Sequence, residues 1–241
     1  MLNHHTVQAE LLSGFEFLMP ETQAMQLDDF ANPGMVSVEE GRVLFATTGS
    51  NGKACADCHG EQGSKLNPKR IAKYPVYSES LKAVVTLQGQ INICWDDKLE
   101  NPPAIYDSRT SIALETMVRH LARGEVVNVD ISGPMQKHYE AGRELYNMRF
   151  GQLDMACVQC HDQFRGKYLR AQKLNQGHSN GFPEYRLGSG HITSFQRRIA
   201  ECFVSFRAEP FEFGSEELIN LEVYVHARGN GLKIETPAVR Y

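Results

Sequence analysis

The sequence lacks a long apolar run, a dense basic run and a basic leader. No stretch approaches the roughly 18 consecutive apolar residues of a membrane span, so we expect none. Lysine and arginine are scattered through a chain of net charge −4, which argues against nucleic acid as a partner. The apolar patch over residues 11–19 follows no basic segment and is interrupted by Glu16, so we expect no secretory signal in this chain.

Cysteine is also scarce, and four of the six cysteines occur in two copies of one motif. The motif C-x-x-C-H stands at residues 55–59 and again at 157–161. Two thiols at this spacing form thioethers with the vinyl groups of a haem, and the adjacent histidine reaches its iron. We therefore predict two covalently bound c-type haems, rather than zinc bound by the cysteine pairs. The expected attachment residues are Cys55, Cys58, Cys157 and Cys160, and the expected proximal ligands are His59 and His161.

The two motifs belong to a longer internal repeat. Upstream, the segment Gly41 to Phe45 (GRVLF) matches Gly142 to Tyr146 (GRELY). Downstream, YPVY at residues 74–77 matches FPEY at residues 182–185. Because each half repeats the same order of features, we predict two cytochrome c-like domains in tandem and an all-α fold.

The repeat divides the chain into three parts. We predict an irregular N-terminal extension over residues 1–36, a first haem domain over 37–133 and a second haem domain over 134–241, which carries the catalytic haem. Gly133-Pro134 is the expected junction. Apolar spacing and capping residues predict helices from about residue 37 and over residues 80–95, 108–123, 135–148, 194–206 and 215–228.

Two cysteines remain, Cys94 and Cys202, and each follows the downstream part of its repeat at the same spacing. Three interpretations compete: a disulfide, buried unreactive thiols, or the sixth ligands of the two haem irons. Matching positions in separate haem domains favour axial ligation. The methionines and histidines that usually fill this role do not stand at matching positions. Since a thiolate stabilises Fe(III), such haems have low reduction potentials, which points to chemistry at sulfur.

The charges around these two cysteines differ. Arg198 stands one helical turn before Cys202, and Arg228 ends the last predicted helix. Positive charge keeps a cysteine as thiolate and attracts an oxyanion, although these arginines have glutamates and haem propionates as competing partners. Beside Cys94, residues 95–97 are Trp-Asp-Asp, which repel anions. We therefore expect two haems with different roles.

These features together resemble the SoxA family, the di-haem subunit of the SoxAX cytochrome, or L-cysteine S-thiosulfotransferase. The resemblance extends from about Val36 to the C-terminus. It rests on residues 55–59, 74–77, 91–94, 151–161, 177–178, 197–202 and 228–240.

The resemblance implies a location, partners and a reaction. Proteins of this family are periplasmic and form a heterodimer with SoxX, a small mono-haem cytochrome c, so a signal peptide is expected to have been removed from this chain. The implied reaction joins thiosulfate oxidatively to a cysteine of the sulfur carrier SoxYZ. A cysteine S-thiosulfonate forms, and two electrons pass to cytochrome c.

The resemblance also implies roles for single residues. Cys202 is implied as the catalytic axial ligand of the second haem, as a thiolate or a persulfide. Arg198 and Arg228 are implied to hold thiosulfate, and Cys94 is implied to ligate the first haem. Two alternatives remain open: a thiosulfate dehydrogenase that forms tetrathionate, and an electron-transfer cytochrome without a substrate of its own.

Overall fold

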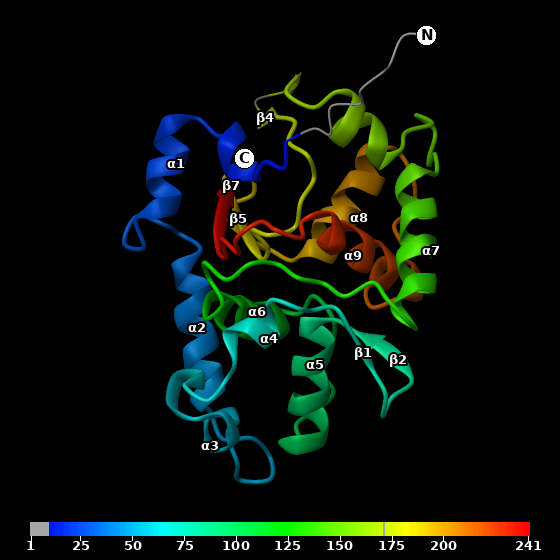
Figure 1. Cartoon of the computed structure of the whole chain (residues 1–241). Helices are drawn as coiled ribbons and strands as arrows, with labels where there is room; N and C mark the ends of the chain where they lie inside the picture. The colour runs from blue at the N-terminus through cyan, green and yellow to red at the C-terminus, as the bar shows by residue number, and fades with distance from the viewer. Residues whose placement is uncertain (1–9, 171) are drawn as a thin grey trace, which may run out of the picture.

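The computed structural model describes residues 10–170 and 172–241, and its helices form two similar units, one above the other in Figure 1. Residues 1–9 of the predicted extension over residues 1–36 therefore lie outside the described residues. The longer helices are α2 (Met35–Ala46), α6 (Arg109–His120), α7 (Met135–Asn147), α8 (Phe195–Ser205) and α9 (Glu216–Arg228). Each agrees with a helix predicted from the sequence. In the described part of the chain, no helix is long and apolar enough to cross a membrane.

Short elements complete each unit, so the predicted helical fold is confirmed with small hairpins added. The shorter helices are α1 (Pro20–Leu27), α3 (Cys55–His59), α4 (Pro68–Ile71) and α5 (Leu87–Ile93). The strands are β1 (Val76–Ser78), β2 (Ala83–Val85), β3 (Tyr168–Leu169), β4 (Gln172–Lys173), β5 (Glu184–Arg186), β6 (His191–Thr193) and β7 (Ala238–Arg240). Strands β1 and β2 form one antiparallel hairpin and β5 and β6 another, and β7 pairs with β5 in parallel.

The repeated glycines mark the points where two helices cross. Helix α2 crosses α6 at Gly41, and α7 crosses α9 at Gly142. A Cβ atom at Gly41 would lie 2.3 Å from the carbonyl oxygen of Ala113, and one at Gly142 would lie 2.0 Å from that of Asn220. Both distances are far below van der Waals contact, so only glycine permits the helices to approach this closely.

The downstream repeat forms a hairpin that leads into the helix of the unpaired cysteine. The helix predicted over residues 80–95 is wrong in its first part, because residues 83–85 (Ala-Val-Val) form β2 and α5 begins only at Leu87. The β-branched valines favour the strand. The side chain of Thr86 then caps α5 by accepting a hydrogen bond from Gly89 N at 3.0 Å, as Ser194 caps α8 by accepting from Arg197 N at 3.0 Å.

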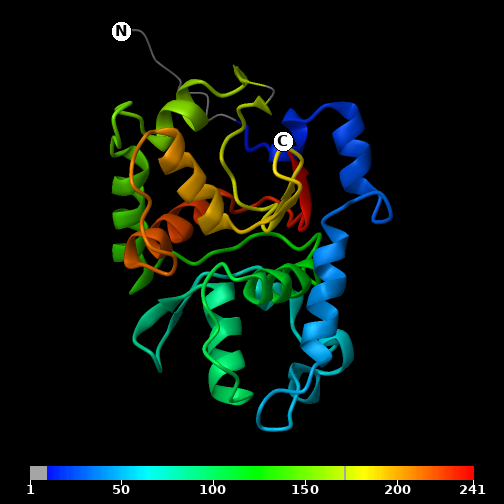
Figure 2. The same ribbon diagram turned by 180° about the vertical axis from the view of Figure 1, so that it is seen from behind.

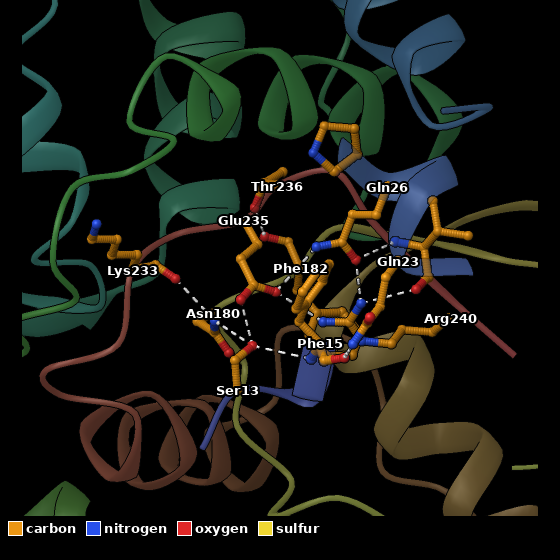
Figure 3. Close-up of polar contacts among 12 residues, drawn as sticks. Ser13, Phe15, Gln23, Gln26, Asn180, Phe182, Lys233, Glu235, Thr236 and Arg240 are labelled. Atoms are coloured by element: carbon orange, nitrogen blue, oxygen red, sulfur yellow. Dashed lines mark hydrogen bonds and ion pairs between the residues drawn. The ribbon is translucent and has the colours of Figure 1, made fainter. Parts of the chain in front are cut away.

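The described part of the N-terminal extension packs against the second unit, although the next helix, α2, belongs to the first (Figures 1 and 2). Gln26 of α1 accepts a hydrogen bond from Val239 N at 3.1 Å. It also accepts one from the guanidinium of Arg240, and both side chains are labelled in Figure 3. Ser13 donates to Glu235, and Arg240 forms an ion pair with Glu235 at 3.0 Å. The extension therefore holds the C-terminal strand β7 in place.

The two units meet at a buried polar network that repeats the same pattern twice. Gln88 Nε2 donates to Glu115 Oε2 at 2.8 Å in the first unit, and Gln196 Nε2 donates to Glu222 Oε2 at 3.1 Å in the second. Burial raises the pKa of Glu115 to about 7 and that of Glu222 to about 8, the second raised further by the neighbouring Glu115. The buried guanidinium of Arg119 partly offsets both shifts.

The helix crossing predicts the effect of a single methyl group. Gly142→Ala places a Cβ against the backbone of α9, so we expect the free energy of unfolding to fall by about 1–3 kcal/mol. Gly188→Ala is the control, because no atom lies within 4 Å of its Cβ position. Thermal or denaturant unfolding of the haem-loaded protein measures both. Equal stability of the two variants would contradict this account of the crossing.

The buried carboxyls predict a dependence of stability on pH. Their pKa values are raised above the ordinary value of 4.5, so the folded protein binds more protons than the unfolded chain, and stability falls as the pH rises from about 4.5 through 7–8. Burial holds the pKa of His226 well below 6.5, so this histidine adds little slope in the upper part of the window.

Between about pH 6 and 9, we expect the free energy of unfolding to fall less in Glu222→Gln than in the parent protein. The two falls should differ by about 1 kcal/mol or more, because the amide needs no proton to stay neutral. Glu217→Gln, at an exposed position of the same helix, is the control and should keep the parent slope. Denaturant unfolding across this pH range is the measurement. Parallel curves for the parent and Glu222→Gln would contradict the prediction.

Candidate haem and sulfur site

The first haem-attachment motif lies on one wall of a cavity in the first unit. Helix α3 carries Cys55, Cys58 and His59, and its start is fixed by Asp57, whose carboxylate accepts a hydrogen bond from Ala54 N at 2.7 Å. Cys94, at the end of α5, lines the same cavity. The other walls are mainly apolar and include Phe45, Ile71, Leu87, Leu114 and Val118.

The second motif lies in an equivalent cavity of the second unit. Cys157, Cys160, His161 and Cys202 all line it, and Cys202 comes from α8. Its apolar walls include Tyr146, Phe182, Phe195, Phe203, Leu221 and Val225. Tyr146 and Phe45 are the aromatic residues of the upstream repeat, so the repeat places the same type of side chain against each cavity.

The orientation of His161 suits an iron ligand. Its Nδ1 donates to the carbonyl oxygen of Asn175 at 3.0 Å, which leaves Nε2 free to coordinate a metal. Gly177 backs the ring, since a Cβ there would lie only 2.7 Å from Cγ of His161. The donor set of each cavity, two thiols and an imidazole with a further thiol, fits a covalently attached haem.

The unpaired cysteines line different cavities. All six cysteines lie within the described residues and are free, so the disulfide interpretation of Cys94 and Cys202 is wrong. Burial raises the pKa of Cys55 to about 11, with a further increase from nearby Cys94. Burial likewise raises the pKa of Cys157 to about 12, with a further increase from Cys202. Each unpaired cysteine lines the same cavity as one pair of attachment cysteines.

Arg198 lies where the sequence predicted, beside Cys202 on the same helix. It lines the second cavity, and its guanidinium forms an ion pair with Glu201 at 3.1 Å. Burial lowers the pKa of Arg198, but the negative charges of Cys202 and Glu184 outweigh this effect and raise it. Thirty per cent of the Arg198 side chain is exposed.

Arg228 lies beside the second attachment motif. Its Nη2 donates to Asp162 at 2.6 Å, and its guanidinium lies 4.7 Å from the centre of the ring of Tyr146, which lines the second cavity. The end of α9 directs this side chain toward the short helical segment Gln159–Gln163, which contains both His161 and Asp162. The structure therefore brings Arg198 and Cys202 together and places Arg228 beside the histidine.

Two other arginines line the second cavity, and the sequence analysis did not identify them. Arg186 and Arg240 are partners in the parallel pairing of β5 with β7, which places both at this wall. Arg186 forms an ion pair with Glu184 at 3.0 Å, and Arg240 pairs with Glu235. No local pattern links residues so far apart in the chain, so only the strand pairing reveals them.

Known proteins match this chain in both of its units. The family model described as SoxA/TsdA, cytochrome c domain, matches residues 40–127 and 141–234. The L-cysteine S-thiosulfotransferase subunit SoxA of Rhodovulum sulfidophilum is 43% identical over 232 residues, covering 96% of this chain and 80% of that protein. The chain belongs to the SoxA family.

Further relatives agree with this assignment. The SoxA subunit of Pseudaminobacter salicylatoxidans is 42% identical over 96% of this chain and 81% of its own length. A chain in the crystal structure of SoxXA from Paracoccus pantotrophus matches with a TM-score of 0.89 and 34% identity, covering 96% of this chain and 87% of that chain. The predicted assignment to a c-type cytochrome subunit of an L-cysteine S-thiosulfotransferase is confirmed.

The packing of Gly177 on His161 is testable. Gly177→Ala pushes a methyl group against the imidazole ring, so we expect weaker ligation by His161, seen as a changed low-spin absorption and EPR spectrum, while the haem stays covalently attached. Gly166→Ala is a matched control: its φ is also positive, but no atom lies within 4 Å of its Cβ position. Identical spectra for both variants would rule out this role of Gly177.

Proposed function

We propose that this chain is a periplasmic di-haem cytochrome that joins thiosulfate to a cysteine of a SoxYZ-like sulfur carrier. The observation that carries the proposal is the placement of Arg198 and Cys202, one helical turn apart on α8, in the wall of the cavity that also holds the second haem-attachment motif. A cation, a reactive sulfur and a redox group at one place suit the oxidative joining of two sulfur atoms.

The proposed ligands follow the two cavities. His59 and Cys94 bind the first haem iron, and His161 and Cys202 bind the second. This assignment is supported because, in each cavity, the attachment motif and one unpaired cysteine line the same space. When bound, each c-type haem supplies a one-electron acceptor.

The reaction balances as the loss of two electrons and one proton. The carrier thiol and thiosulfate form a new sulfur–sulfur bond, giving the cysteine S-thiosulfonate, one proton and two electrons. Arg198 attracts the thiosulfate dianion and orients its sulfonate group, so that the sulfane sulfur meets the sulfur of Cys202. The two electrons leave toward a SoxX-like mono-haem cytochrome c, the partner that we propose for this chain. The similar Paracoccus pantotrophus structure, named SoxXA, supports that choice of partner.

Arg228 has a different place in this proposal. Its direct contact with thiosulfate stays a prediction, and the contacts that it makes suit a positioning residue. By binding Asp162, the residue after His161, its guanidinium stabilises the short helical segment that carries the histidine. The pair is 21% and 38% exposed, so this ion pair is partly shielded from solvent.

The periplasm is proposed because the attachment of haem to C-x-x-C-H takes place outside the bacterial cytoplasm. The carrier and SoxX-like partner are expected in the same compartment.

The test is replacement of the proposed reactive sulfur. Cys202→Ala should abolish thiosulfate-dependent modification of the carrier while both haems stay attached, because the thioether cysteines are untouched. Val204→Ala, at an exposed position of the same helix, is the control and should keep full activity. Mass spectrometry of the carrier and a haem stain of the cytochrome are the measurements. Full activity of Cys202→Ala would refute the proposal, and tetrathionate formed without carrier would favour the thiosulfate dehydrogenase alternative.

A further inference from the structure

The two cavities differ at one corresponding position of the cysteine helices. Thr86 caps α5 and Ser194 caps α8, and the unpaired cysteine follows each cap at the same spacing. In this alignment Gln90 corresponds to Arg198, each standing one helical turn before its cysteine. Both side chains line their cavities. The first site therefore has a neutral amide where the second has a permanent cation.

The amide of Gln90 contacts the sulfur directly. Its Nε2 donates a hydrogen bond to Sγ of Cys94 at 3.4 Å, a normal distance for a sulfur acceptor, and the contact is partly buried. Asp96, two residues beyond Cys94, is engaged elsewhere, since its carboxylate accepts from Ala104 N at 2.7 Å. Within the described residues, Gln90 supplies the side-chain donor that contacts this sulfur.

A hydrogen bond to a coordinating sulfur has two effects. It restrains the direction in which the sulfur lone pairs point, and it withdraws electron density from the sulfur. A weaker thiolate donor stabilises Fe(III) less, so the reduction potential rises. A neutral amide does this without attracting a dissolved dianion, whereas a guanidinium at the same position does both.

We propose that Gln90 is a positioning residue that holds Cys94 as the axial ligand of the first haem and raises the potential of that haem, without giving it affinity for an anionic substrate. This inference rests on the proposed ligation by Cys94. The first site then acts as an electron carrier. It differs from the site that binds thiosulfate because one helical position holds a glutamine, Gln90, in the first unit and an arginine, Arg198, in the second.

Two substitutions with opposite expected directions test the proposal in the haem-loaded protein. Gln90→Leu removes the donor at similar size, so we expect the equilibrium constant for reduction of the first haem to fall three- to tenfold, at most about 59 mV for one electron. Gln90→Arg adds a positive charge, so the same constant should rise. Potentiometric titration followed by absorbance and EPR gives both values, and the second haem of the same molecule is the internal control.

The outcomes separate this inference from the proposed function. A general disturbance of the helix would shift both variants in the same direction, and that result, or an unchanged potential in both, would overturn the role of Gln90. Cys94→Ala is the companion variant. If it leaves the thiolate-type EPR signal of the first haem intact, the proposed ligation by Cys94 fails. If it removes that signal while the Gln90 variants keep the parent potential, only the role of Gln90 fails.

Discussion

The close crossing of two helices in each unit is the constraint on which the rest of the structure depends. At Gly41 and Gly142 the absence of a side chain lets two helix backbones touch, and any larger residue would push them apart. This contact fixes α6 relative to α2, and α9 relative to α7. Many of the apolar residues that line each cavity stand on these crossing helices or on the helix that leads to the unpaired cysteine, so the crossing sets the shape of the space in which a haem would be held.

On this shared scaffold, charge rather than shape distinguishes the two sites. In the second cavity Arg198, Arg186 and Arg240 each form an ion pair with a glutamate, but Arg198 is partly exposed beside Cys202, whereas Arg186 and Arg240 are largely buried. Arg198 is therefore the most exposed of these three cations. The corresponding first site has Gln90 beside Cys94. One duplicated architecture thus supports an electron carrier and a reactive sulfur centre.

Side-chain contacts across the boundary between the units join the start of α8 to the first unit. Ser194, which caps α8, also donates to Asp107 of the first unit at 2.5 Å, and Arg197 forms an ion pair with the same carboxylate. The helix that carries Cys202 therefore begins at a contact with the other unit. Because Glu222 is buried and Glu115 half-buried at this boundary, its stability depends on protons that they hold near neutral pH.

The sequence alone determined the features that are covalent or local. The haem motifs, the repeat and the five longer helices follow from residue types at short spacing, because thioether chemistry and helix periodicity act within a few residues. Only the tertiary structure decided what depends on contacts between distant segments. No local pattern records which strand or helix will lie beside another. Four features therefore require the folded chain: the hairpin before α5, the docking of the N-terminal extension on β7, the placement of Arg228 beside Asp162, and the position of Arg186 and Arg240 at the second cavity.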